Sequence, residues 1–176
     1  MARKKVAPTA TTAPKATDSG KGLDYATFME LLPHMIDRGR LANALAMLRT
    51  ERFKLFAQVD AESVVGVVRS QSSKERVYSC RLTKDGDFAC CTQNLRHCGG
   101  LRGAVCKHLL VLIVGLARSG QLDPDLAERW TRASRARRPH LDKDVMSATF
   151  LRYKGAEAGE IDWRPTETIP EDYYAL

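Results

Sequence analysis

Four of the five cysteines in this 176-residue chain lie within seventeen residues, and this crowding constrains the fold more than any other feature of the sequence. They are Cys90, Cys91, Cys98 and Cys106, and His108 follows two residues after the last of them. A single cysteine is usually a small buried apolar side chain. Four thiols this close together, in a chain whose first residues show no apolar export segment, indicate a metal site rather than a disulfide framework.

The residue types and their spacing favour zinc. Zinc prefers four tetrahedral ligands of cysteine sulfur and histidine nitrogen, and a structural site uses all four positions. Cys106 and His108 can bind one ion together if Cys106 precedes a helix and His108 lies in its first turn, where the helix N-terminus also favours a thiolate. Cys98, in a glycine-rich loop, is expected to be the third ligand. Either Cys90 or Cys91 supplies the fourth.

The pattern around the cysteines predicts an α+β fold, with N-terminal helices, a small antiparallel sheet, a zinc-bound loop, a buried helix and a further C-terminal helix. Hydrophobic spacing and capping residues predict the helices, and alternating β-branched runs predict the strands. The first expected helix begins after Asp24 and extends to about Pro33. The other expected helices cover 41–48, 107–118 and 124–136. The expected strands are 54–59, 64–69, 77–82 and 88–91, with a further short strand at 146–152.

The hairpin between the third and fourth strands determines where the thiols point. Residues 84–86 (Lys-Asp-Gly) suit a three-residue loop with Gly86 in the left-handed conformation. In that register Cys80 faces Cys90. A two-residue loop would instead place Cys91 opposite Cys80, because a shift of one residue moves every side chain to the other face. Cys80 itself, in the middle of a strand, is expected to pack in the core.

The predicted hairpin with its cysteines is followed by a glycine-rich loop and then by GLRGAVCKHLLVL, which enters an apolar helix. This arrangement resembles the SWIM zinc finger, whose pattern is Cys-x-Cys, a variable spacer and Cys-x-His. Cys106 and His108 match the final pair. The first pair departs from the pattern, since Ala89 and Thr92 occupy the positions where a cysteine would be needed, and Cys98 is expected to replace the second ligand. The resemblance covers about residues 64–118.

The resemblance implies a zinc-stabilised ββα module of the bacterial type that binds DNA or protein. Family members occur in bacterial proteins associated with AAA+ ATPases, in transposase-like proteins and in plant regulators. An AAA+ ATPase-linked assembly is therefore one context that the resemblance implies for this chain.

Charge is distributed unevenly along the chain, which has a formal net charge of +7. Residues 1–22 carry +4, residues 23–154 carry +8 and residues 155–176 carry −5. A basic body suggests an acidic partner, either nucleic acid or a protein surface. The helix expected at 124–136 and the residues after it supply an arginine-rich face that either contacts phosphates or covers apolar surface with its stems. Its members are Arg129, Arg132, Arg135, Arg137 and Arg138.

These features predict a disordered basic tail over 1–22, a single α+β domain over 23–153 and an acidic extended segment over 154–176. No apolar run has the roughly 18 residues that a membrane span needs, so a cytoplasmic protein is expected. The first functional hypothesis is a non-enzymatic zinc module that recruits a protein partner, because a closed site offers no position for a small-molecule substrate. The alternative is DNA or RNA binding through the basic body. A third is a redox switch in which oxidation ejects zinc.

Overall fold

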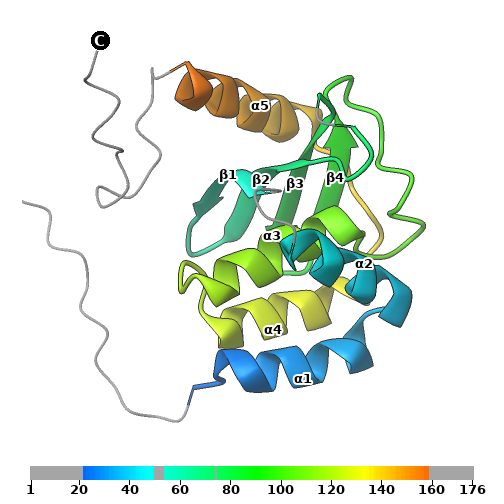
Figure 1. The fold of residues 1–176 in the computed structure, drawn as a ribbon, viewed down its shortest axis with the longest axis vertical. Coiled ribbons are helices and arrows are strands. Elements are labelled where there is room, and N and C mark those ends of the chain that lie inside the picture. The colour runs from blue at the N-terminus through cyan, green and yellow to red at the C-terminus, as the bar shows by residue number, and fades with distance from the viewer. Residues whose placement is uncertain (1–21, 50–53, 74, 159–176) are drawn as a thin grey trace, which may run out of the picture.

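An antiparallel sheet with the strand order β1-β2-β3-β4 lies at the centre of the fold (Figure 1). The computed structural model describes residues 22–49, 54–73 and 75–158. Within them, five helices and this sheet form the predicted α+β fold. The elements are α1 (Tyr25–Met35), α2 (Arg38–Arg49), β1 (Lys54–Val59), β2 (Ser63–Arg69), β3 (Val77–Thr83), β4 (Phe88–Thr92), α3 (Lys107–Arg118), α4 (Pro124–Ser134) and α5 (Lys143–Glu157).

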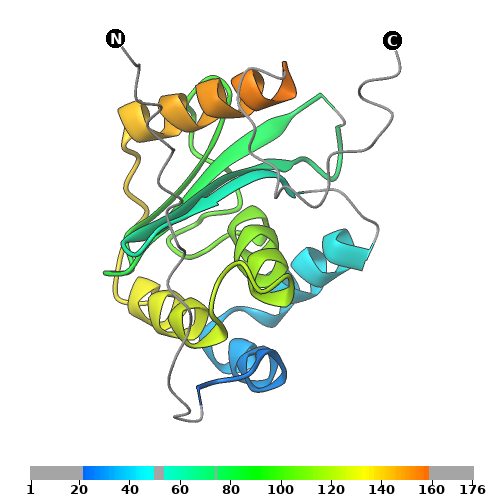
Figure 2. The ribbon, with the colours of Figure 1, turned by 90° about the vertical axis from the view of Figure 1, so that its left-hand side faces the viewer.

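Helices cover both faces of the sheet (Figure 2). On one face α3 packs against β2 and β3. Helices α2 and α4 pack against α3, and α1 packs against α4 and α2. On the opposite face α5 is the one described helix, and it packs over a smaller apolar cluster that includes Val67, Cys91 and Phe150. Because both faces are covered, neighbouring residues of one strand enter two different cores, and Phe88–Cys91 are buried without a break.

Local cap chemistry starts the helices where the sequence predicts. The carboxylate of Asp24 accepts a hydrogen bond from the backbone N–H of Thr27 at 2.8 Å, which satisfies a free donor of the first turn of α1. Asp123 caps α4 in the same way. Helix α3 is buried on nearly all sides, as its apolar composition predicts.

The strand predicted at 146–152 is wrong, because these residues lie inside α5. The Asp142 side chain accepts a hydrogen bond from the backbone N–H of Val145 at 3.1 Å and caps the helix. Met146 and Phe150, four residues apart, then face the sheet from one side of the helix. The segment expected to be extended from residue 154 is accordingly helical as far as Glu157.

The predicted hairpin register is confirmed. Cys80 lies opposite Cys90, and the backbone N–H of Gly86 donates to the carbonyl of Thr83 at 3.0 Å. Gly86 has a φ of +84°, a conformation that glycine adopts without steric cost. Thr83 also closes the loop by donating its own N–H to the carbonyl of Asp87.

Two sequence expectations concern residues that the structure does not describe. The basic tail expected over 1–22 lies outside the described residues except at its last position, and so does residue 159 onward of the acidic segment. In the part that is described, every helix is too short or too polar to cross a membrane.

Gly66 lets α3 approach the sheet closely. A Cβ atom at this position would lie 2.6 Å from both Leu112 Cδ1 on α3 and the backbone oxygen of Phe56. We therefore expect Gly66→Ala to lower the free energy of unfolding by about 2 kcal/mol, as overpacking of a core does. Urea denaturation measures this change. Gly99→Ala is the matched control, because a Cβ there meets nothing within 4 Å; equal stability of the two variants would contradict the close approach.

Candidate metal centre

Three segments that are separate in the sequence bring the candidate ligands together. Cys90 lies in β4 on the face that α3 covers. Cys98 follows in the loop, where its backbone N–H donates to the carbonyl of Cys90 at 2.9 Å. Cys106 occupies the N-cap position of α3 in an extended conformation, and His108 lies in the first turn of that helix. The strand, the loop and the helix start therefore converge on one point.

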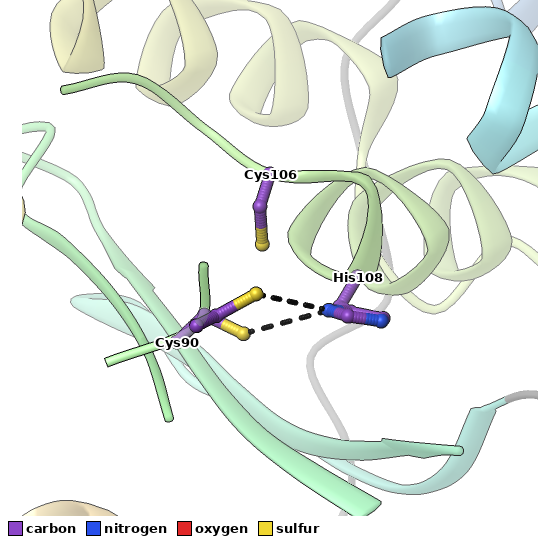
Figure 3. A group of neighbouring side chains, drawn as sticks. Cys90, Cys106 and His108 are labelled. Atoms are coloured by element: carbon purple, nitrogen blue, oxygen red, sulfur yellow. Dashed lines mark hydrogen bonds between the residues drawn. The ribbon is translucent and has the colours of Figure 1, made fainter. Parts of the chain in front are cut away.

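The ligand atoms of Cys90, Cys98, Cys106 and His108 all lie within 4.8 Å of one another, and all four residues are buried. His108 Nδ1 is 3.4 Å from Cys98 Sγ and 3.9 Å from Cys90 Sγ (Figure 3). A tetrahedral zinc ion with Zn–S of about 2.3 Å and Zn–N of about 2.0 Å separates sulfur from sulfur by about 3.8 Å and sulfur from nitrogen by about 3.5 Å. The two sulfur–nitrogen distances lie close to this value, and the cluster is thus positioned to hold a metal ion.

The choice left open between Cys90 and Cys91 is decided by the alternation of side chains along β4. Cys90 points towards α3 and the other ligands, whereas Cys91 points to the opposite face and packs near Met146 and Phe150 of α5. Burial raises the pKa of the Cys91 thiol to about 12. Cys91, the alternative upstream ligand, therefore lies outside the set of mutually close ligand atoms, and its side chain packs in the apolar layer under α5.

The thiols of the cluster affect the pKa values of one another. The pKa of Cys98 is lowered because the thiols of Cys106 and Cys90 donate hydrogen bonds to its thiolate. Burial is the main reason that the pKa values of Cys90 and Cys106 are raised. A second or third buried negative charge would be very costly without a cation. A soft divalent ion between the sulfurs removes that cost, and thiolate with imidazole is the ligand set that such ions select.

Two residues outside the ligand set hold it in place, and no pattern in the sequence predicts either role. Arg40 on α2 donates through one guanidinium nitrogen to the backbone oxygens of Leu101 and Val105, at 3.1 and 2.9 Å. These carbonyls belong to the loop between Cys98 and Cys106, so the contacts fix that loop against α2. Tyr78 on β3 stacks on the ring of His108, with the ring centroids 3.8 Å apart.

A cavity of about 570 Å³ adjoins the cluster between α2, the glycine-rich loop and the start of α3. Two of the four ligands, Cys98 and His108, form part of its wall. The remaining ligands, Cys90 and Cys106, are fully buried. Solvent therefore approaches the cluster from the Cys98 side.

The structure also shows where Cys80 and His97 lie. Cys80 is fully buried in the core, as predicted, and it does not belong to the set of mutually close ligand atoms. Its Sγ nevertheless lies 3.7 Å from Cys90 Sγ. All five cysteines are free thiols, and the side chain of His97 is exposed.

All five arginines of the predicted basic face are exposed, and three of them pair with carboxylates of the same chain. The pairs are Arg129 with Asp125 at 3.2 Å, Arg132 with Glu128, and Arg137 with Asp87 at 3.7 Å. Among the described residues, Arg135 and Arg138 have no ion pair. The face is therefore partly neutralised by its own fold, which reduces the charge that it offers to phosphates.

Comparison with known proteins finds no matching family model, no matching curated protein and no matching solved structure. The resemblance to the SWIM zinc finger consequently depends on the residues of the cluster and on the elements that carry them.

Substitution of neighbouring cysteines in β4 tests the ligand assignment. We expect Cys90→Ala to lose its bound metal, because only three ligands remain, and Cys91→Ala to retain one equivalent per chain. Metal content of the purified variants, measured by plasma mass spectrometry, reports the result. Both changes remove a buried thiol from the same strand, so they are matched in type; loss of metal from Cys91→Ala alone would reverse the assignment.

Proposed function

We propose that this chain is a SWIM-type module whose fold is stabilised by one structural zinc ion bound to Cys90, Cys98, Cys106 and His108. The observation that carries the proposal is the burial of three thiols and one imidazole nitrogen within 4.8 Å of one another. The four groups complete the tetrahedral coordination that structural zinc adopts. Three thiolates and one divalent ion leave a net charge of −1, and Lys107 and Arg102 lie close enough in the sequence to offset it.

Removal of zinc tests the structural role. Zinc can contribute on the order of 10 kcal/mol to folding at neutral pH, which is comparable to the total stability of a domain. We therefore expect a strong chelator to unfold the protein, and Cys106→Ala to prevent folding in the presence of zinc. Circular dichroism with and without added zinc measures both effects. A soluble, natively folded Cys106→Ala protein without metal would contradict a structural zinc.

The function that this site supports best is non-enzymatic recruitment of a protein partner. Four protein ligands leave no coordination position open for a substrate or an activated water, which a catalytic zinc requires. The basic body of residues 23–154 favours an acidic surface on the partner. An AAA+ ATPase-linked assembly is the context that the SWIM resemblance suggests for such an adaptor.

DNA or RNA binding is the second candidate, favoured by the +8 charge of residues 23–154 and by the exposed, unpaired Arg135 and Arg138. Each phosphate contact would add to the salt dependence of binding. The internal pairing of Arg129, Arg132 and Arg137 makes this candidate the weaker one, because those cations already have carboxylate partners.

Affinity purification from the native cell separates the two candidates. We expect the same protein partners to be recovered from nuclease-treated and untreated lysates, since direct protein contacts do not need nucleic acid. Mass spectrometry identifies the partners. Two results together would favour nucleic acid instead. The first is a set of protein partners that disappears after nuclease treatment. The second is binding to duplex DNA that weakens steeply between 50 and 200 mM salt, as about six or more phosphate contacts require.

A further inference from the structure

All five cysteines lie in the described part of the chain, and Cys80 is the thiol that touches the ligand set without belonging to it. Its Sγ is 3.7 Å from Cys90 Sγ, and both residues are fully buried. We propose that Cys80 and Cys90 form a disulfide when a peroxide oxidises the cluster, and that this bond releases the metal. The inference rests on the proposed zinc site for its second part, while the disulfide itself requires only the two sulfurs.

The sheet register places these two cysteines in a position suited to a disulfide. Thr83 donates its N–H to the carbonyl of Asp87, which makes that pair a hydrogen-bonded one. Directly opposed residues alternate between hydrogen-bonded and non-hydrogen-bonded pairs along an antiparallel ladder. Cys80 and Cys90, three positions further along, are therefore a non-hydrogen-bonded pair. The Cα atoms of such pairs are about 4.5 Å apart, within the range of about 4.4 to 6.8 Å that a disulfide spans.

The direction of the Cys90 backbone supports the same assignment. Its carbonyl accepts a hydrogen bond from Cys98 in the following loop, on the side away from β3. No ladder bond between Cys80 and Cys90 therefore has to break when their sulfurs approach. The sulfurs must move from 3.7 Å to a bond length of about 2.05 Å, which rotation of the two side chains can provide without a change of register.

The oxidant reaches the cluster through the cavity on whose wall Cys98 lies. Cys98 is slightly exposed, unlike Cys90, and its Sγ lies within 4.8 Å of Cys90 Sγ. Cys98 is therefore the sulfur that a peroxide meets first, Cys90 is next to it, and Cys80 lies beyond Cys90. This order allows the oxidation to pass inward from one sulfur to the next.

The chemistry balances in three steps. The Cys98 thiolate attacks hydrogen peroxide, so that an S–O bond forms, the O–O bond breaks and hydroxide leaves, to be protonated by solvent. The Cys90 thiolate then attacks the Cys98 sulfur, forming a disulfide and expelling the second hydroxide, which is also protonated to water. Cys80 finally attacks the Cys90 sulfur. The Cys80–Cys90 bond forms, the Cys90–Cys98 bond breaks, and the proton of Cys80 passes to the departing Cys98 thiolate.

In the net reaction the sulfurs of Cys80 and Cys90 lose two electrons, the peroxide gains them and two waters form. Cys98 returns to its starting oxidation state, now as a thiol that carries the proton of Cys80. The cluster then has three ligands in place of four, which opens a closed structural site. A reductant reverses the change, because a disulfide is a reversible stage of thiol oxidation, whereas sulfinic acid is not.

Peroxide titration of the metal-loaded full chain tests the proposal. Metal content is measured first, release is followed with a chromogenic chelator, and disulfides are mapped by alkylation, digestion and mass spectrometry. We expect the Cys80–Cys90 peptide to appear in step with metal release, and dithiothreitol with added zinc to restore full metal content. In Cys80→Ala the third step cannot occur, so the Cys90–Cys98 peptide should appear in place of the Cys80–Cys90 peptide.

Cys91→Ala is the matched control, since it also removes a buried strand cysteine and should behave like the unaltered chain. Metal release from the unaltered chain with Cys80 still open to alkylation after denaturation would overturn the proposal. A Cys90–Cys98 peptide as the main oxidised product of the unaltered chain would overturn it as well. A chain that purifies without metal would contradict the proposed zinc function instead. The Cys80–Cys90 disulfide would then still be tested on that protein, because the unaltered chain carries the thiol contact with or without metal.

Discussion

The convergence of three buried thiols on one histidine nitrogen is the constraint on which the rest of the structure depends. Cys90 comes from the sheet, Cys98 from the loop, and Cys106 with His108 from the start of α3. Each element is held to the others at this point, and the loop between them is rich in glycine. A cation among the sulfurs would neutralise charges that the apolar surroundings cannot solvate. The proposed zinc ion would therefore couple metal binding to the folding of this region.

The packing around the cluster shows how a short loop can present ligands accurately. Arg40 binds two carbonyls of the loop from α2, and Tyr78 covers the ring of His108 from β3. Helix α3 is buried along most of its length, so its first turn has a fixed position relative to the sheet. Ligand geometry is best maintained when the supporting side chains are themselves held by packing and hydrogen bonds.

The two faces of the sheet give adjacent cysteines different chemistry. Cys90 faces the cluster, whereas Cys91 enters the apolar layer under α5, where burial raises its pKa to about 12 and makes it a poor nucleophile. Cys80 shares the face of Cys90 and lies next to it without being a ligand. A closed metal site with one additional thiol in contact has a different response to oxidants from a site whose thiols all bind the metal. The proposed adaptor would then bind its partner only while the cluster is reduced.

The sequence by itself determined the features that depend on near neighbours. The Lys-Asp-Gly loop sets the register of Cys80 against Cys90, the aspartates before α1 and α4 set where those helices begin, and Cys-Lys-His before an apolar run places two ligands on α3. Cap and turn chemistry act within a few residues, so a local pattern is enough. Only the tertiary structure decided that Cys90 rather than Cys91 joins the cluster, that residues 146–152 are helical, and that Arg40 fastens the ligand loop. Each of these depends on which distant element covers a given face, and contacts across sixty residues of sequence leave no local pattern by which to recognise them.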